Sequence, residues 1–466
     1  MHRLLRTVTA TLVGLLLAVT ATPAQAAPAP TPRITPGEYR GQLASGATWL
    51  GHVPEAWNGE LIVFSHGYGS RTAQDAPNEQ VRQVLLSEGY ALVGSSYSGP
   101  SLWALESAPG DQAAAIRAFT TTLRAEPDRT IALGTSMGGL VSALLAQNPR
   151  AGIDGVLTTC GLVAGGINLN NYQLDGLYAL TRLLAPERTL PLVRYRSPEQ
   201  AADVAAQIVA IVTAAQATPQ GRARIALGSA LLNMPTWYSE SATAPSPRDY
   251  AGQEQEQFRG LTAGGIERYV TGRQQIELAA GGNTAWNVGV NYRTLLDSSV
   301  HAEQVRALYR SAALDLRADL DTLTRDADVT ADPAAVRKLT RTSMVTGNVR
   351  VPHLTMHTVA DDLVPVEQEN WYRKQVASAG DAPRVRQAYV HAAGHCRFRP
   401  REHLAALHAL EQRIERGTWG TATEPARLND DGRTADEAGG APRFVEFTPP
   451  RLVGGLREPG RAARRR

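Results

Sequence analysis

The sequence predicts an α/β fold: a mostly parallel β-sheet with helices on both faces and a large helical cap inserted into it. Short apolar runs typical of strands alternate with helical segments over residues 60–160 and again over residues 351–416, as in parallel sheets covered on both sides. Residues 161–348 contain mostly segments with helical spacing of apolar residues. A connection this long is expected to fold into a cap, because long structureless loops are uncommon in compact domains.

The N-terminus is predicted to be a signal peptide. Residues 1–26 combine a positively charged start, an apolar core at Leu12–Val19 and small residues around the cleavage site. The apolar run is too short to span a bilayer. We therefore expect cleavage near Ala26, a secreted protein, and a short extended leader at residues 27–38.

The first part of the core, residues 39–160, is expected to start with a β-hairpin at 39–53. It continues with strands at 60–65, 91–96, 130–133 and 155–160 and helices at 81–88, 111–124 and 137–147. Within the cap at 161–348, helices are expected at 201–217, 221–232, 253–278 and 302–323.

The second part of the core, residues 349–416, predicts strands at 351–358 and 384–390 and helices at 366–379 and 401–416. Residues 417–466 are rich in Gly, Pro, Asp and Glu, so a loosely structured C-terminal tail is expected there, with one strand-like piece at 443–447.

The charge and cysteine content limit the classes of partner and cofactor that are expected. With 47 basic and 44 acidic residues the formal net charge is +3, so no strong field for nucleic acid is expected, nor stable membrane insertion. Cys160 and Cys396 are the two cysteines of the chain. In an exported protein two cysteines predict one disulfide, and the chain has no CxxC pair for a metal or redox site. No cofactor and no metal are expected.

The most informative motif is the Gly-x-Ser-x-Gly pentapeptide from Gly134 to Gly138. A strand-like run enters it and a helix-like run leaves it, which is the context of a nucleophile elbow. This turn would hold Ser136 in a strained conformation with its hydroxyl at the sheet edge. Ser136 is therefore the predicted nucleophile.

A serine nucleophile needs a base that is oriented by an acid. In this architecture the chain order is Ser, acid, His, and both partners are found beyond strands of the second core part. Asp361 is the predicted acid, with the adjacent Asp362 as the alternative, and His395 is the predicted base. Three other histidines fall within or at the ends of strands, where a hydrogen-bonded structural role is expected: His353, His357 and His391.

These motifs resemble those of the α/β-hydrolase superfamily over most of residues 39–416 outside the insertion. The turn from Asp361 to Pro365 matches the family's Asp-x-x-Val-Pro pattern, and Gly394-His395 matches the position of its base. Tetrahedral intermediates need two backbone N–H donors. The resemblance implies that Met137, after the nucleophile, and Tyr68, in a His-Gly-x segment, supply them.

Cys396 directly follows the predicted base, which is similar to tannase- and feruloyl-esterase-like hydrolases. In those proteins a cysteine beside the serine bonds one beside the histidine, whereas here Thr135 precedes Ser136. The available partner is Cys160, after the strand that follows the elbow. A bond would hold the His395 loop to the sheet edge. The alternative is that both cysteines are small buried side chains that never meet.

The expected function is that of a secreted serine hydrolase that cleaves carboxylic esters, small or polymeric, through an acyl-enzyme and without a cofactor. One alternative is a secreted exopeptidase of the same fold, which would need acidic groups in the cap to bind a free amino terminus. Another is a non-catalytic binding protein on a hydrolase scaffold. The substrate is determined by the cap, whose sequence does not identify it.

Overall fold

The computed structural model describes residues 34–434, 441–455 and 457. The expected signal peptide at 1–26 and most of the expected leader at 27–38 lie outside these residues. None of the described helices is long and apolar enough to cross a membrane.

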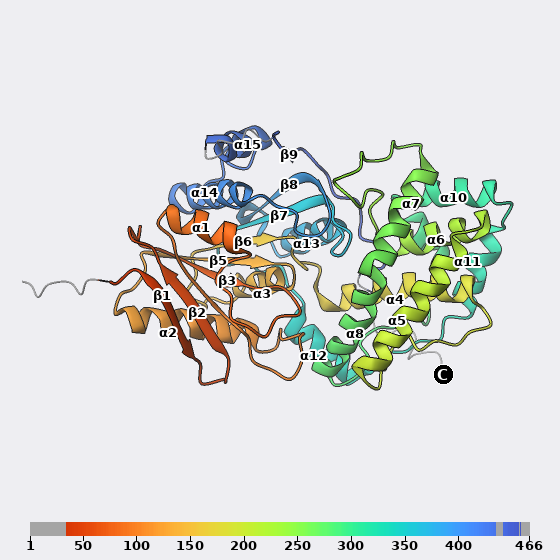
Figure 1. Ribbon diagram of the computed structural model, residues 1–466, viewed down its shortest axis with the longest axis horizontal. Helices are drawn as coiled ribbons and strands as arrows, with labels where there is room; N and C mark the ends of the chain where they lie inside the picture. Colours follow the sequence, from red (N-terminus) through yellow and green to blue (C-terminus); the bar gives the residue numbers. More distant parts are fainter. Residues whose placement is uncertain (1–33, 435–440, 456, 458–466) are drawn as a thin grey trace, which may run out of the picture. The chain divides into compact units, whose positions relative to one another are not determined.

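A nine-stranded sheet forms the centre of the α/β part, in the order β1-β2-β4-β3-β5-β6-β7-β8-β9 (Figure 1). The strands from β4 to β8 in this order run parallel, whereas β1, β2 and β9 pair antiparallel at the two edges. The bounds are β1 (Gly37–Gln42), β2 (Thr48–Val53), β3 (Glu60–Ser65), β4 (Ala91–Ser95), β5 (Arg129–Thr135), β6 (Gly155–Thr159), β7 (His353–Ala360), β8 (Val385–Ala393) and β9 (Phe444–Val445). The predicted mostly parallel α/β fold is confirmed.

Helices cover both faces of this sheet. Figure 1 shows α1 (Glu79–Ser87) and α14 (Pro400–Arg416) on one side and α2 (Ala108–Leu123) and α3 (Met137–Leu145) on the other. Apolar residues of α1 and α14 pack against the central strands in one buried cluster, which includes Leu85, Leu133, Leu354 and Leu407. Burial of these apolar side chains is the main favourable term that holds the layers together. The second core part also contains α13 (Glu367–Ser378) and the 3-10 helix η2 (Ala382–Arg384).

A helical insertion separates β6 from β7. Its elements are α4 (Gly165–Leu184), α5 (Pro198–Ala215), α6 (Pro219–Leu231), α7 (Tyr250–Gly260), η1 (Leu261–Gly265), α8 (Ile266–Ala280), α9 (Tyr292–Asp297), α10 (Ala302–Ser311), α11 (Leu316–Arg325) and α12 (Pro333–Ser343). These helices bury a hydrophobic core of their own, with Leu177, Ile208, Leu227 and Tyr309 among its members. The insertion is therefore a helical layer with its own packed interior.

Several insertion helices differ from the sequence expectation. The helix expected at 253–278 is divided at the π-helical turn η1, where Gly264 has φ 110°. The helix expected at 302–323 is two helices, with Ala313 at φ 51° between them. Helix α4 is not among the expected helices: it is buried on almost every side and carries Asn170, Asn171 and Asp175 inside. A helix without a solvent face shows no amphipathic period that could reveal it.

The C-terminal region also differs from the expected loose tail. Residues 417–434 include α15 (Pro425–Thr434), and β9 lies at the expected strand-like piece. The chain then reaches the insertion, where Val453 is buried and both its N–H and its carbonyl bond the side chain of Asn233, at 2.7 and 3.2 Å. The composition of this region, rich in Gly, Pro and charged residues, predicts a loose tail because only a few of its residues are buried and hydrogen-bonded.

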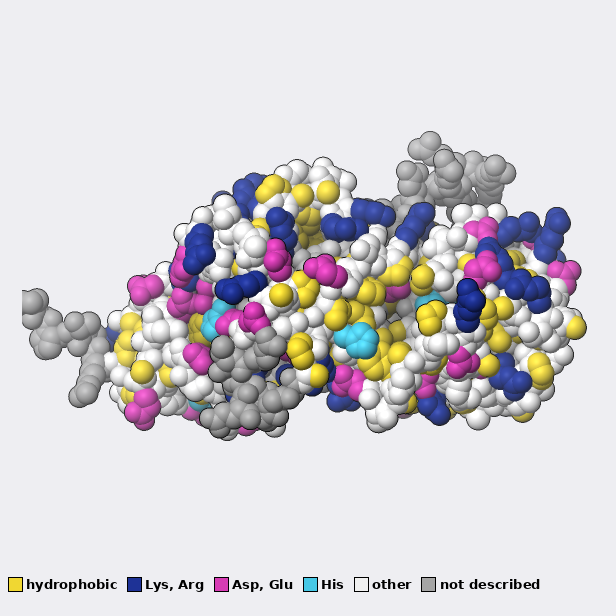
Figure 2. Space-filling model, turned by 90° about the horizontal axis from the view of Figure 1, so that it is seen from above, with side chains coloured by type: hydrophobic (Ala, Val, Ile, Leu, Met, Phe, Trp, Pro, Cys, Tyr) yellow, Lys and Arg dark blue, Asp and Glu magenta, His cyan; other side chains and the backbone are white. Residues whose placement is uncertain are grey.

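Hydrophobic side chains gather on the face of the molecule that Figure 2 shows, and named contacts join the insertion to the sheet part. The Trp237 ring packs on the His391 ring of β8, with 5.1 Å between ring centroids. Beside them, Arg443 pairs with Glu240 of the insertion at 2.8 Å and with Glu402 of α14 at 2.8 Å. These contacts fix the insertion near the edge at which the parallel strands end, where sites of open α/β sheets lie.

Candidate active site

Ser136 lies in the sharp turn between β5 and α3. Its backbone has φ 58° and ψ −121°, a conformation that costs a non-glycine residue free energy and persists because the surroundings hold it. A Cβ on Gly138 would lie 1.9 Å from the carbonyl oxygen of Ser65, and one on Gly134 would lie 2.1 Å from the carbonyl oxygen of Gly138. Close backbone approach therefore requires both glycines of the motif, and the turn presents the Ser136 hydroxyl at the sheet edge.

The loop after β8 carries His395. Gly394 begins this loop with φ 94°. Its N–H donates to the carbonyl of Ala360 at 2.9 Å, and its own carbonyl accepts from the hydroxyl of Thr358 at 3.0 Å. These bonds tie the loop to β7. They leave Nε2 of His395 at 2.9 Å from Oγ of Ser136.

Asp361, directly after β7, bonds the other nitrogen of that ring. Nδ1 of His395 lies 2.8 Å from Oδ2 of Asp361. The second carboxylate oxygen accepts the N–H groups of Leu363 and Val364, at 3.0 and 2.8 Å. Asp361 is buried. Burial alone would raise the pKa of Asp361, but the His395 and His357 rings outweigh burial and hold that pKa below its usual range. Asp361 is therefore a fixed, ionised acceptor for the imidazole.

Asp362 has a different position from its neighbour. Its Oδ1 accepts the backbone N–H of His395 at 2.9 Å, and its carbonyl accepts the Tyr269 hydroxyl at 3.0 Å. Burial, together with the charge of Asp361, raises the pKa of Asp362. Of the two adjacent aspartates, Asp361 contacts the ring and Asp362 holds the backbone of the loop.

The two predicted oxyanion donors belong to segments next to Ser136. Met137 is the first residue of α3, where an N–H has no acceptor within the helix. The turn after β3 passes beside the nucleophile, because a Cβ on Gly67 would lie 3.4 Å from Cβ of Ser136. Tyr68 is the next residue in this turn, and burial raises the pKa of its hydroxyl to about 12.

The turn that carries Tyr68 is held from behind by His66. The His66 ring stacks on Tyr97 with 4.0 Å between centroids, and the Tyr97 hydroxyl donates to the carbonyl of His66 at 3.1 Å. Burial lowers the pKa of His66, so a neutral ring is expected there. The position of the His66 ring is consistent with a structural role, in which it holds the turn that carries Tyr68.

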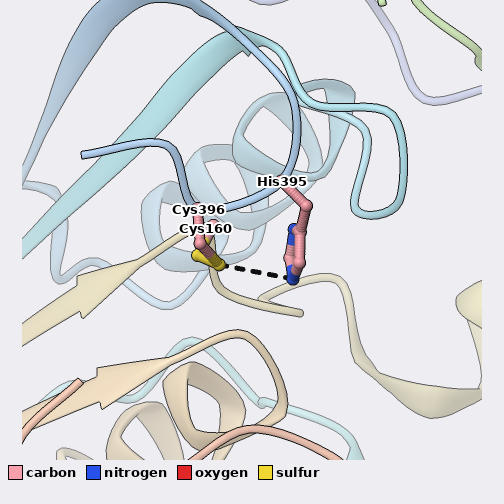
Figure 3. A group of neighbouring side chains, drawn as sticks. All are labelled: Cys160, His395 and Cys396. Atoms are coloured by element: carbon pink, nitrogen blue, oxygen red, sulfur yellow. Dashed lines mark hydrogen bonds between the residues drawn. A yellow bond between two sulfur atoms is a disulfide. The ribbon is translucent and has the colours of Figure 1, made fainter. Parts of the chain in front are cut away.

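A disulfide joins Cys160, the residue after β6, to Cys396 (Figure 3). The two Cα atoms are 5.3 Å apart. Sγ of Cys396 lies 3.3 Å from Nε2 of His395, the same nitrogen that faces Ser136. The predicted pairing is present, and it links the sheet edge to the loop that carries the imidazole.

Cys160, Cys396 and His395 are, among the described residues, the one group of Cys, His and acidic side chains close enough together to share a metal ion. Both sulfur atoms are bonded to each other. Cysteine binds metals as the thiolate. While the disulfide is formed, the His395 imidazole is therefore the one side chain of this group that could bind a metal ion.

A buried polar cluster lies behind Asp361, and the sequence indicates only part of it. His357 is expected there as a structural residue, whereas no motif marks Glu369. Nδ1 of His357 lies 3.0 Å from Oε1 of Glu369, and its Nε2 lies 2.8 Å from the carbonyl of Val364 and 3.5 Å from Oδ2 of Asp361. The one sequence signal is the His-x-Thr-x-His pattern that starts at His353, which places polar residues at alternate positions of an otherwise apolar strand.

Elements of the insertion reach the site. Tyr269 of α8 contacts the Asp362 carbonyl, and Gln275 of the same helix accepts the backbone N–H of Leu102 at 2.9 Å. The indole N–H of Trp103 donates to the Ser343 hydroxyl of α12 at 3.1 Å. The loop after β4 is thus bonded to two helices of the insertion.

No family model matches the chain. It is 27% identical to the o-phthalyl amidase of Xanthobacter agilis over 421 residues, which cover 84% of this chain and 90% of the amidase. Among solved structures it is similar to an acylaminoacyl peptidase of Pyrococcus horikoshii, with 14% identity and a TM-score of 0.37 over 81% of this chain and 41% of the peptidase. It is also similar to an esterase of Aspergillus oryzae, with 16% identity and a TM-score of 0.41 over 80% and 78% of the two chains. The chain spans about two fifths of the peptidase.

The strand order and the turn at Ser136 establish the architecture without these likenesses. The similarity to the amidase extends over most of both chains. The chain is therefore a protein of the α/β-hydrolase fold.

Proposed function

We propose that the chain is a serine hydrolase that cleaves carboxylic esters through an acyl-enzyme. The observation that carries the proposal is the continuous hydrogen-bonded series from the Ser136 hydroxyl through the His395 ring to the Asp361 carboxylate. A serine in a strained turn, a base within reach of its hydroxyl and a buried acid behind the base are the parts that this chemistry needs.

In the proposed reaction, Oγ of Ser136 attacks the substrate carbonyl while Nε2 of His395 takes its proton. Asp361 keeps Nδ1 protonated and stabilises the imidazolium that forms. The N–H groups of Met137 and Tyr68 bind the oxyanion. His395 then protonates the leaving alkoxide, which departs as an alcohol. Water, activated by the same imidazole, hydrolyses the acyl-enzyme to the carboxylic acid and restores Ser136.

The helical insertion at 161–348 is proposed to act as a cap that selects the substrate. Contacts of Tyr269, Gln275 and Ser343 with the site's loops support this role. A cap that excludes water strengthens the electrostatic interactions within the site. Export is part of the same proposal, since a disulfide beside the base suits an oxidising compartment.

Amide hydrolysis is a second candidate, because the relative from Xanthobacter agilis is named an o-phthalyl amidase. The same residues can cleave an amide if His395 protonates the leaving amine. An o-phthalyl group carries a carboxylate ortho to the acyl carbonyl, so it makes a defined test substrate. Exopeptidase activity and binding without catalysis would each give a distinct result in the same experiments.

The test combines labelling with a matched set of substrates. A fluorophosphonate probe is expected to label Ser136, located by peptide mass spectrometry, and Ser136→Ala is expected to lose labelling and on the order of a millionfold in kcat. Ser87→Ala, at the exposed end of α1, is the control and should keep both. An unlabelled Ser136 in folded protein would contradict the proposal and favour a binding protein.

The leaving group is then varied with the benzoyl group held constant, and the acyl group is varied with the 4-nitroanilide leaving group held constant. 4-Nitrophenyl benzoate, benzoyl 4-nitroanilide, o-phthalyl 4-nitroanilide and aminoacyl 4-nitroanilides are compared by kcat/KM. A preference for the ester supports the first candidate, and a preference for o-phthalyl over benzoyl anilide supports the second. Turnover of the free-amine substrates alone would indicate an exopeptidase.

A further inference from the structure

His357 is fully buried, and both of its ring nitrogens face oxygen atoms. Nε2 lies 2.8 Å from the carbonyl of Val364, which can only accept, so this nitrogen carries a proton. Nδ1 lies 3.0 Å from Oε1 of Glu369. An ionised carboxylate also only accepts, so Nδ1 carries a proton as well. The geometry is that of an imidazolium.

Two buried carboxylates flank this ring. Asp361 is 1% exposed and Glu369 is 0% exposed. Oε2 of Glu369 accepts from the Thr355 hydroxyl at 2.7 Å and from the Gln387 amide at 2.6 Å, as an ionised carboxylate would. Two buried negative charges without a cation would be very costly, and the charge of His357 offsets that cost.

We propose that His357 is a positioning residue whose buried positive charge, held between Asp361 and Glu369, sets how strongly Asp361 stabilises protonated His395. This inference rests on the proposed function of Ser136, His395 and Asp361. Nε2 of His357 lies 3.5 Å from Oδ2 of Asp361, the oxygen that contacts the His395 ring. The cation weakens the negative potential at His395, so His395 becomes a free base at lower pH and Ser136 is activated there.

The pKa values of the cluster agree with this arrangement. Burial alone would lower the pKa of His357, but its bonds to Asp361 and Glu369 raise that pKa to about 10. Other titratable groups around the cluster include Glu367, Asp362, Tyr172, Tyr269, Tyr372 and Tyr389, and the charges of Arg268, Arg373 and Asp381 act on these groups in turn. Burial raises the pKa of Glu367 to about 7, so Glu367 can titrate in the pH range in which activity develops.

The test uses two substitutions, one that removes a positive charge from the cluster and one that removes a negative charge. Both are made in a Glu367→Gln background so that residue 367 does not titrate. His357→Gln removes the cation while its amide can still donate to Val364. Glu369→Gln removes the anion on the far side of the ring. The acidic limb of the pH profile of kcat/KM is measured, together with the pH dependence of fluorophosphonate labelling.

His357→Gln is expected to move the midpoint of the acidic limb to higher pH by roughly half a unit to one unit. The lost cation lies beside Asp361, so its removal strengthens the negative potential at His395. Glu369→Gln is expected to move the midpoint to lower pH. A purely structural role would lower kcat in both variants without opposite shifts.

His353→Gln is the matched control. His353 lies on the same strand and is equally buried, but its ring bonds the hydroxyls of Tyr372 and Thr158, at 2.8 and 3.2 Å, and no carboxylate. This variant should leave the midpoint unchanged. Thermal unfolding of each variant shows that it is folded. As a readout without turnover, the titration of the His395 ring is followed by NMR in the Ser136→Ala background.

The outcomes separate this inference from the proposed function. If the parent protein is not labelled at Ser136, the proposed function fails. If the parent is labelled with an acidic limb but both variants keep its midpoint, or shift it in the same direction, the role of His357 is overturned. If the variants do not fold in the protein that retains Ser136, the same substitutions are compared in the Ser136→Ala protein by the NMR titration of His395. A His395 titration that is unshifted or cannot be observed there counts against the inference.

Discussion

At the scale of single residues, two adjacent carboxylates have different partners. Asp361 contacts the His395 ring, whereas Asp362 accepts the backbone N–H of His395. Their backbone positions differ by one residue, so the end of β7 directs one side chain to the ring and the other to the loop. Chain order alone could not separate them, because both follow the same strand.

We predict unequal effects of replacing these two aspartates by asparagine. Asp361→Asn removes the charge that orients and stabilises the imidazolium, and kcat should fall by about 10⁴-fold. Asp362→Asn keeps an oxygen that can accept from the His395 backbone, and kcat should stay within about tenfold of the parent. Steady-state kinetics on the same substrate measures both. The opposite order of effects would assign the acid to Asp362.

At the scale of elements, the site depends on how the ends of β5, β6, β7 and β8 are held together. These strands are parallel neighbours, so their carboxyl ends meet at one sheet edge. Ser136, Cys160, Asp361 and His395 follow them within two residues each. The Cys160–Cys396 disulfide adds a covalent link between the second and the fourth of these ends.

Removal of this disulfide is expected to lower the free energy of unfolding and to make the loop that carries His395 more mobile. It closes a loop of 236 residues, for which the chain-entropy description gives up to roughly 5 kcal/mol. The double variant Cys160→Ser, Cys396→Ser should lose part of this free energy of unfolding, measured with denaturant. Titration of thiols in the unreduced, denatured parent should find none.

Mild reduction of the parent should lower kcat before it unfolds the domain, while the double variant should not respond to the reductant. The control excludes an effect of the reductant on the substrate or assay. Two reactive thiols per unreduced chain, or a parent that keeps full activity after complete reduction, would contradict the role given to the bond.

At the scale of the whole molecule, buried charge makes stability depend on pH. The folded protein raises the pKa of His357 to about 10, whereas a histidine of the unfolded chain titrates near 6.5. Between these values the folded state keeps a proton that the unfolded state has lost. The contribution is therefore fully present below about pH 6.5 and is lost as the pH rises toward 10.

We predict that the free energy of unfolding falls between pH 7 and 9, by up to about 1.4 kcal/mol per pH unit for this one proton. Denaturant unfolding at a series of pH values measures the slope. His357→Gln should flatten it. His408→Gln is the control, because the hydrogen bond to Asp431 also raises the pKa of half-buried His408, yet this variant should keep most of the slope. Equal slopes in the parent and His357→Gln would contradict the prediction.

The sequence by itself determined the strands of the core, the turn at Ser136 and the residues that the parallel sheet brings together. Local signals sufficed, because apolar runs, glycines at a close backbone approach and polar residues beyond strand ends each have a physical meaning at one position. The pairing of Cys160 with Cys396 followed from there being two cysteines in a chain expected to be exported.

Only the tertiary structure decided the rest. Helix α4 has no solvent face, so its sequence shows no amphipathic period. The choice between Asp361 and Asp362 depends on the direction of side chains one residue apart. The bond of His357 with Glu369 joins a strand to the helix that packs on it, and the tail is held by Val453 and Asn233, which are 220 residues apart. Such contacts depend on which surfaces meet after folding, and no local pattern of residues encodes that.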